Sequence, residues 1–373
     1  MRMAARCALL CLALLLLCAD PVRAEQEAQR LVETLDIGPL EHAAEEAELD
    51  LNVTAFLRGF VTGEIPLDPD SLLQKARTLF LAAWQRTLAF FPGVLLPALL
   101  GALMARLASG RGATVAQFIC CLAGALAEAA LLRELIESVG GALRQTAGIA
   151  EAVFPLLAGL LAASGAGTTA SMLASTAAFA CRSAVHLFGT VGPRFCAINA
   201  AVAVAGSLNP RLSLNKLFSL LADLGKWAAG IAMTFLVGLL SVQGLLGAGY
   251  DSASVRAARY AVDNLLPVIG GEVADTLDAM ISSARLVKNA AGVTGMALVV
   301  AVCVRPLLQT TAALICLRLA AAAIEPLGEN ALAQMTERFA EVIRLLLIFA
   351  AACAVQLLLL LGGFLVVGKS AVR

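Results

Sequence analysis

The residues that could do chemistry gather in one stretch of the second half of the chain, between 263 and 289. A helix beginning near Ala274 would place Asp275 and Asp278 on one face, since they are three residues apart. The stretch also joins a proline to paired glycines, as discontinuous membrane helices do. We therefore predict a functional element made of Asp263, Asn264, Pro267, Gly270, Gly271, Asp275, Asp278, Lys288 and Asn289.

The charges of this element have two interpretations. At membrane depth, an unpaired charge costs several kcal/mol, so charged residues there are functional by default. Alternatively, the stretch is an amphipathic helix at the membrane interface with a solvated polar side.

No constellation for catalysis or metal binding is present in the sequence. There is no Ser/His/Asp set. His42 and His186 are far apart in sequence, and the cysteines beyond the first 24 residues lie in apolar segments. We expect no enzyme activity, no cofactor and no metal.

The composition indicates an integral membrane protein. Of the 373 residues, 60% are hydrophobic and 14% charged, and the mean hydropathy is +0.87. A water-soluble fold of this length could not bury so much apolar surface. The net charge is zero and no basic stripe with interleaved aromatics is present, so we expect membrane lipid and no nucleic acid as partners. We predict an all-α, polytopic membrane protein.

The first residues read as a secretory signal. Arg2 and Arg6 precede an apolar stretch too short to span a bilayer comfortably, and Val22-Arg23-Ala24 supplies small residues for a signal peptidase. We predict a signal peptide over 1–24 that is cleaved after Ala24. An uncleaved membrane anchor is the alternative.

A small extracytoplasmic helical segment is expected over 25–86. Its first half is acidic, and amphipathic patterns follow in its second half. This segment is either a solvated cap beside the membrane or a docking surface for another exported domain.

The first transmembrane helix pair is expected over 87–144. Apolar stretches at 88–105 and 113–132 are each near spanning length, and a short turn with Arg106 and Arg111 joins them. By the positive-inside rule this turn is cytoplasmic, in agreement with an exported N-terminus.

The rest of the chain predicts an internal duplication, with membrane repeat A over 145–250 and membrane repeat B over 251–373. Aligning the two pairs Pro155 with Pro267, an offset of 112 residues (267 minus 155), and Pro210 with Pro326, an offset of 116 (326 minus 210). Gly192-Pro193 and Arg305-Pro306 fall between them in the same register. The first part of each repeat joins Pro to Gly and is short or polar, so we expect discontinuous or re-entrant helices there.

Several sequence segments in the second half of the chain resemble the stage III sporulation protein AE family, and the resemblance covers most of the chain after residue 24. They are Lys226-Trp227, FLVGLLSVQG (235–244), RAARYAVDNLLPVIGGEVADTLD (256–278), LVKNAAGVTG (286–295) and AAAIEPLGEN (321–330). The chain departs from the family in its more acidic first segment and in the paired glycines at 270–271.

The resemblance implies a role in endospore formation. It implies a membrane component of a channel or secretion-like apparatus in the mother-cell membrane surrounding the forespore. The implied partners come from the same operon, including a secretion-type ATPase and ring-forming proteins, together with a forespore protein. The chain would be a pore or export-platform subunit. We hypothesise that the element from Pro267 to Asn289 is its gate or coupling helix.

Two other functions fit the same sequence. One is a stand-alone secondary transporter with repeat symmetry, which the broken helices favour. The other is a membrane scaffold without a conduction path.

Overall fold

The computed structural model describes residues 38–46, 53–61, 69–107, 111–208, 214–239, 270–327 and 330–370. Within these ranges every regular element is a helix, so the predicted all-α class is confirmed. The predicted signal peptide, 1–24, lies outside the described residues.

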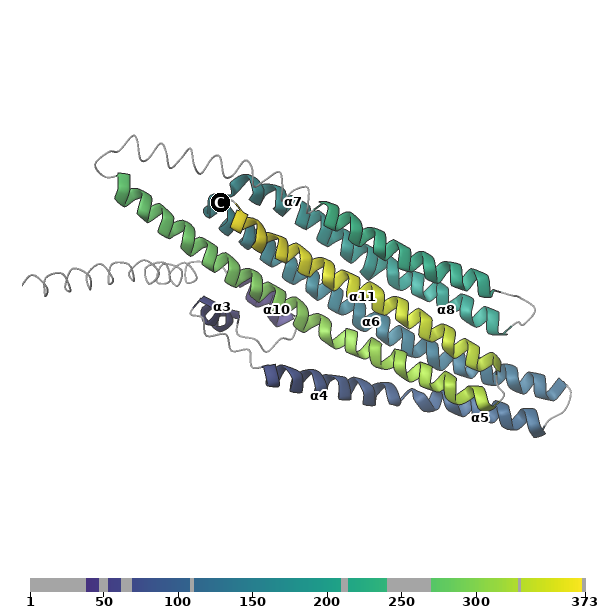
Figure 1. Cartoon of the computed structure of the whole chain (residues 1–373). Helices are drawn as coiled ribbons and strands as arrows, with labels where there is room; N and C mark the ends of the chain where they lie inside the picture. Colours follow the sequence, from purple (N-terminus) through teal and green to yellow (C-terminus); the bar gives the residue numbers. More distant parts are fainter. Residues whose placement is uncertain are drawn as a thin grey trace, which may run out of the picture.

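The helices vary from one turn to more than 50 residues (Figure 1). They are α2 (Gly38–Glu46), α3 (Val53–Val61), α4 (Pro69–Leu88), α5 (Phe91–Leu107), α6 (Arg111–Ala163), α7 (Gly167–Ala184), the π-helix η1 (Val185–Val191), α8 (Gly192–Leu208), a helix over Asn215–Leu239 that we call helix 215–239, α10 (Gly270–Ile324), the 3-10 turn η2 (Glu325–Leu327) and α11 (Asn330–Ser370).

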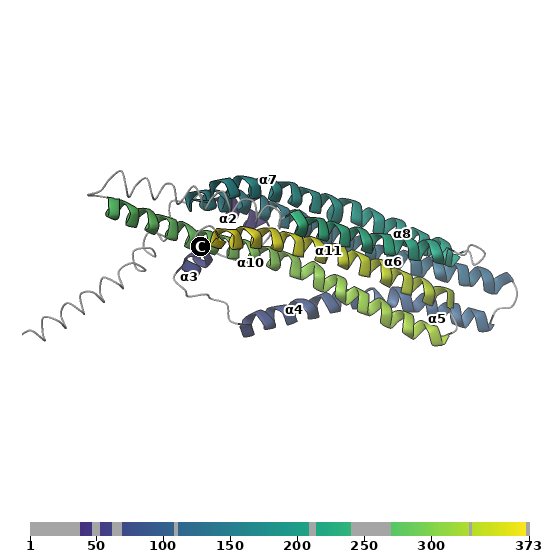
Figure 2. The same ribbon diagram turned by 45° about the horizontal axis from the view of Figure 1, so that its top comes forward.

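The long helices are much longer than a membrane is thick. α6 has 53 residues and α10 has 55. At a rise of 1.5 Å per residue each is roughly 80 Å long, against about 30 Å for the hydrocarbon core of a bilayer. α6, α8, α10 and α11 run along a common axis in both views, so the bundle is elongated (Figures 1 and 2).

The core lies where α10 packs against α11 and α6. Leu157, Val287 and Leu361 from these three helices are all 0% exposed. The rings of Phe154 and Phe364 stack with centroids 5.7 Å apart, which ties α6 to α11. The three helices are apolar on several faces because they are surrounded by other helices.

Six helices of the described residues are long and apolar enough to cross a membrane. The expected turn between the first two spans is present, since α5 ends at Leu107 and α6 begins at Arg111. The expected boundary at residue 145 falls inside α6.

α6 is continuous through Pro155, so the short helix expected there is not observed, but the expected discontinuity does occur later in the same Pro-to-Gly segment. Pro155 lies inside the continuous α6. A proline removes one backbone hydrogen bond, and packing on both sides keeps this helix intact: Phe154 is 3% exposed and Leu157 is fully buried. The break comes later, at Ser164–Ala166, where Gly165 has a φ of 88° that favours glycine. Pro267, the counterpart of Pro155, lies outside the described residues.

A π-helical segment interrupts the run from α7 to α8. The backbone N–H of Gly192 donates to the carbonyl of Leu187, five residues earlier, and Pro193 follows without an N–H of its own. Gly192 also lies against α11, because a Cβ at this position would be 2.7 Å from Cδ2 of Phe349. The absence of a side chain therefore sets the distance between α8 and α11.

We expect Gly192→Ala to destabilise the protein by about 1–3 kcal/mol, because the added methyl group overlaps the ring of Phe349. Gly148→Ala is the matched control, since a Cβ at Gly148 meets nothing within 4 Å and alanine favours a helix by about 0.5–1 kcal/mol. Thermal unfolding of the purified protein in detergent measures both. Equal midpoints for the two variants would contradict the proposed close approach.

Candidate functional site

The structure describes the predicted element only in part. Asp263, Asn264 and Pro267 lie outside the described residues. Gly270, Gly271, Asp275 and Asp278 lie in the first turns of α10, where only the backbone is described. The expected helix carrying both aspartates is therefore present, and it begins at Gly270.

Lys288 is the member of this element whose surroundings are clearest. Its side chain is 1% exposed, and its Nζ donates a hydrogen bond of 3.1 Å to the carbonyl oxygen of Phe364. α11 ends at Ser370, so the cation lies near the negative end of that helix. Asn289, the next residue, is half-buried. Lys288 thus ties α10 to the end of α11.

A second set of polar side chains lies around the middle of the bundle, and we call it the polar belt. Its position along the long axis of the bundle, which we call its level, follows from the register of α6 and α11. Thr336 of α11 donates to Glu128 of α6 at 2.6 Å, and Phe154 stacks on Phe364 further along, so the two helices run in the same direction. Five residues beyond the first contact, Arg133 on α6 and Glu341 on α11 lie at about the same level.

Glu341 is the centre of the belt on one side of the bundle. Its carboxylate is 2.7 Å from Nζ of Lys226 in helix 215–239, 3.4 Å from Arg344, and 4.0 Å from Arg318 of α10. Its side chain is only 22% exposed, so these contacts form in a partly dehydrated place. Arg338, one turn earlier on α11, donates to Ser207 at 3.3 Å and to Asn215.

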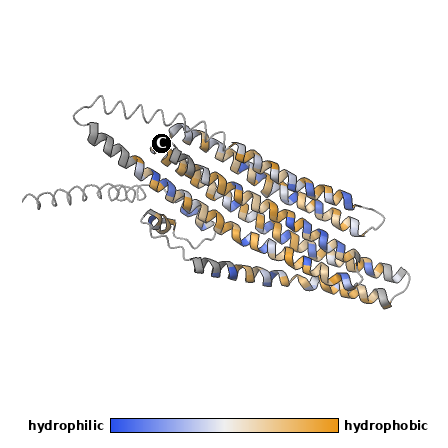
Figure 3. Cartoon of the chain, in the orientation of Figure 1, coloured by the Kyte–Doolittle hydropathy of each residue, from blue (hydrophilic) through white to orange (hydrophobic). Residues whose placement is uncertain are grey.

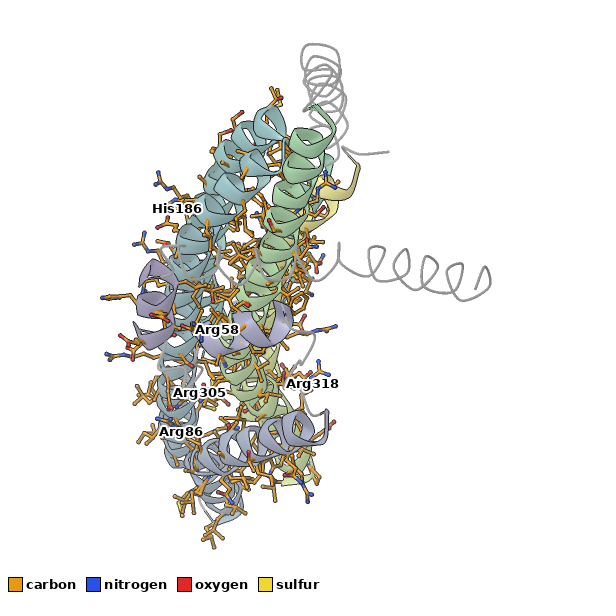
Figure 4. The ribbon with its side chains drawn as sticks, turned by 90° about the vertical axis from the view of Figure 1, so that its left-hand side faces the viewer. Arg58, Arg86, His186, Arg305 and Arg318 are labelled. Atoms are coloured by element: carbon orange, nitrogen blue, oxygen red, sulfur yellow. The ribbon has the colours of Figure 1, made fainter. Side chains whose placement is uncertain are left out.

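Charged residues lie at the same level on the opposite side of the bundle. Arg86 of α4 pairs with Glu134 of α6 at 2.8 Å, and Arg133 pairs with Glu137 at 2.9 Å. In Figure 3 hydrophilic residues interrupt the apolar colouring of the long helices, and Figure 4 shows Arg86 and Arg318 in the same half of the bundle. The belt therefore has charged residues on two sides of the bundle.

The exposure of the belt limits where hydrocarbon can lie. The side chain of Arg133 is 81% exposed and that of Glu137 is 65% exposed. Charged side chains are expensive to place in hydrocarbon, so this level of the protein lies in water or among lipid head groups. The belt divides the bundle into two apolar zones, one holding α5 with the start of α6, the other holding the later parts of α6 and α11.

Three buried polar side chains near or beyond the belt have atoms without a hydrogen-bond partner among the described residues. Glu128 is 0% exposed, and its Oε2 has none although Oε1 accepts from Thr336. Asn199 of α8 has none at either side-chain atom, and Gln356 of α11 has none at Oε1. Buried polar atoms are costly to leave unsatisfied, so each marks a place of functional interest.

Sequence reasoning missed these three residues. Glu128 could have been found, because it is the one charged residue in the apolar stretch 113–132. Asn199 and Gln356 could not, since uncharged amides in apolar helices are common and only packing shows that these are buried. In the part of the chain that the structure describes, no group of three or more His, Cys, Asp or Glu side chains could hold a metal ion.

Comparison with known proteins gives one family. The family model described as "Stage III sporulation protein AE" matches residues 51–370. Stage III sporulation protein AE of Bacillus subtilis (strain 168) is 26% identical over 211 residues, which cover 57% of this chain and 52% of that protein. The chain spans about half the length of the curated relative it matches. No solved structure matches.

We expect Thr336→Val to destabilise the protein by about 1–3 kcal/mol, because it leaves both oxygens of the buried Glu128 without a partner. The double variant Glu128→Leu/Thr336→Val removes both polar groups and should be within about 1 kcal/mol of the unsubstituted protein. Unfolding in detergent distinguishes the two. A double variant no more stable than Thr336→Val would contradict the pairing.

Glu341→Gln should lower stability by about 1 kcal/mol, because three cations share this half-buried carboxylate. Glu137→Gln is the control: the two side chains of its ion pair are 81% and 65% exposed, and we expect no measurable change. The same unfolding measurement applies, and equal effects at the two positions would argue against a special role for Glu341 in the belt.

Proposed function

The chain belongs to the stage III sporulation protein AE family, and from that membership we propose that it acts in endospore formation, as the membrane component of a channel or secretion-like apparatus between mother cell and forespore. The observation that carries the sporulation role is the match of the family model over residues 51–370. Six helices of spanning length fit a membrane component.

Within this apparatus the chain forms the pore or the export platform. Support comes from polar groups at places where a purely structural membrane bundle would be apolar. Glu128, Asn199 and Gln356 are buried, and each has an atom without a partner among the described residues. Ionisable and amide groups inside membrane bundles mark ion and substrate paths. The proposal assigns no catalytic step to the chain, so the energy for transport comes from a partner or an ion gradient.

The partners we propose are the other proteins of the same operon, including a secretion-type ATPase and ring-forming proteins, and a forespore protein. The proposed location is the mother-cell membrane around the forespore. The N-terminal end of α10 is the part of the described chain best placed to meet them, because it projects past the C-terminal end of α11 (Figure 1).

This projecting end is also the proposed gate or coupling element. Lys288 ties α10 to the end of α11. The turns of α10 that precede Lys288, with Asp275 and Asp278, would therefore move relative to this contact. A force applied to these turns would reach the core through a continuous helix. This force would then act on the polar belt and on the core formed by α6, α10 and α11.

We also propose that the body arose by duplication. α8 ends at Leu208 and the next helix begins at Asn215, while α10 ends at Ile324 and α11 begins at Asn330. The spacing of these two breaks agrees with the offset of 112 to 116 residues between the paired prolines (267 minus 155; 326 minus 210).

A stand-alone secondary transporter is the second candidate, and the buried Glu128 favours it, since such transporters use intramembrane carboxylates to couple ions. It predicts substrate uptake by vesicles that hold this protein alone. A non-conducting scaffold instead predicts that no cysteine placed beside Glu128 reacts with a polar reagent in the assembled apparatus.

Deleting the gene in its endospore-forming host tests the proposed function. We expect arrest after engulfment, with small or collapsing forespores and little late forespore gene expression, scored by membrane dye and a reporter. Normal spores would contradict the sporulation role and would favour a stand-alone secondary transporter instead.

Replacing Asp275 and Asp278 together by Asn tests the coupling element. We expect at least a tenfold loss of spores with an unchanged amount of protein, because in this proposal the two charges act on a partner. Glu137→Gln, on the belt surface, serves as the control and should sporulate normally. Unchanged sporulation of the double variant would remove the gate assignment while leaving the channel role open.

A further inference from the structure

Helix 215–239 carries a row of large apolar side chains on its outer face. Leu217, Leu220, Leu224, Trp227 and Ile231 follow one another at alternating intervals of three and four residues. They are 44%, 63%, 53%, 72% and 54% exposed, and Phe235 beside them is 62% exposed. This spacing is that of the a and d positions of a heptad, the pattern by which one helix packs along another. We call these residues the seam.

The opposite face of the same helix is already occupied. Ala222, Ala229 and Leu236 are buried, and a Cβ at Gly225 would be 2.9 Å from Leu345 of α11. The helix is therefore fixed to the bundle by one face while the seam faces outwards.

The level of the seam argues against lipid as its only cover. Lys226 lies at the middle of the helix and pairs with Glu341 in the polar belt. At that level Arg133 is 81% exposed on the other side of the bundle, so the surroundings there are water or head groups. The middle of the row, around Leu224 and Trp227, lies at this level, and an apolar surface at a hydrated level is the kind that another protein covers.

From this surface we infer that two copies of the chain pair along helix 215–239, seam against seam and in the same direction. Two copies in one membrane share an orientation, so a twofold axis along the membrane normal brings equal levels together. The belt of one copy then continues into the belt of the next. Asp223 (70% exposed) and Lys226 (35% exposed) already pair with each other within each copy at 3.5 Å, so the pairing brings no unpaired base to the interface.

The size of the surface suits such a pair. Taking about 200 Å² for a large apolar side chain, the exposed parts of the six residues amount to roughly 700 Å² per copy. Covering both copies completely removes about 1,400 Å², which exceeds the ~1,000 Å² expected of a specific interface. A groove of about 790 Å³ runs beside Trp227, because Gly230 and Thr234 are small. This groove can receive a large side chain of the second copy.

The pairing is independent of the sporulation role, and cysteine cross-linking in native membranes tests it. Single cysteines replace Leu224, Trp227 or Ile231, and Leu126→Cys is the control, because Leu126 is 66% exposed on α6 far from the seam. The unsubstituted protein gives the background from native cysteines. We expect dimers through the same residue at the three seam positions, at least tenfold above Leu126→Cys.

A second variant tests whether the interface can be blocked without disturbing the fold of the single copy. A Cβ at Gly230 meets nothing within 4 Å, so Gly230→Trp fits the single copy but fills the groove. In an Ile231→Cys background it should remove the dimer, whereas Gly148→Trp, also at an open position, should retain it. The inference is overturned if the seam cysteines form no dimer, as expected of a lipid-facing row, if Leu126→Cys dimerises equally well, or if Gly230→Trp leaves the dimer unchanged.

Discussion

The cost of placing charge in hydrocarbon governs how this bundle can sit in a membrane. Arg133, Glu137 and Arg86 are open to their surroundings at one level of an elongated, mostly apolar bundle. That level must be hydrated or lie among head groups. The apolar surface on either side is then divided into two zones, and no single bilayer covers helices of roughly 80 Å from end to end.

Polar contacts between helices fix the register that places the belt. Glu128 and Thr336 join α6 to α11, Lys226 and Glu341 join helix 215–239 to α11, and Lys288 joins α10 to the far end of α11. α11 is thus common to every one of these contacts. Close approaches at glycine support them, since Gly292 and Gly295 of α10 lie against Leu365 of α11 and Val153 of α6.

Sequence reasoning anticipated the class of the fold and the turn at Arg111, because hydrophobicity and span length depend on composition alone. It did not locate the helix break, which lies at Ser164–Ala166 rather than at Pro155, since whether a proline breaks a helix depends on the packing of neighbouring helices. The belt could not be predicted: its residues come from separate segments, and only the tertiary register of α6, α11 and helix 215–239 brings them to one level. The candidate gate was predicted as a helix, and its aspartates do lie on one, but Lys288 proved to be buried rather than solvated.

The most direct test of this architecture is the reaction rate of cysteines with a charged, membrane-impermeant maleimide in membrane vesicles opened on both sides. Cysteines replacing Arg133 and Arg86 should react at rates close to those of a water-exposed thiol, while cysteines replacing Leu103 and Phe118 of the first apolar zone should be at least tenfold slower. Equal protection at both sets of positions would show that hydrocarbon surrounds the belt and would contradict the division of the bundle into two zones.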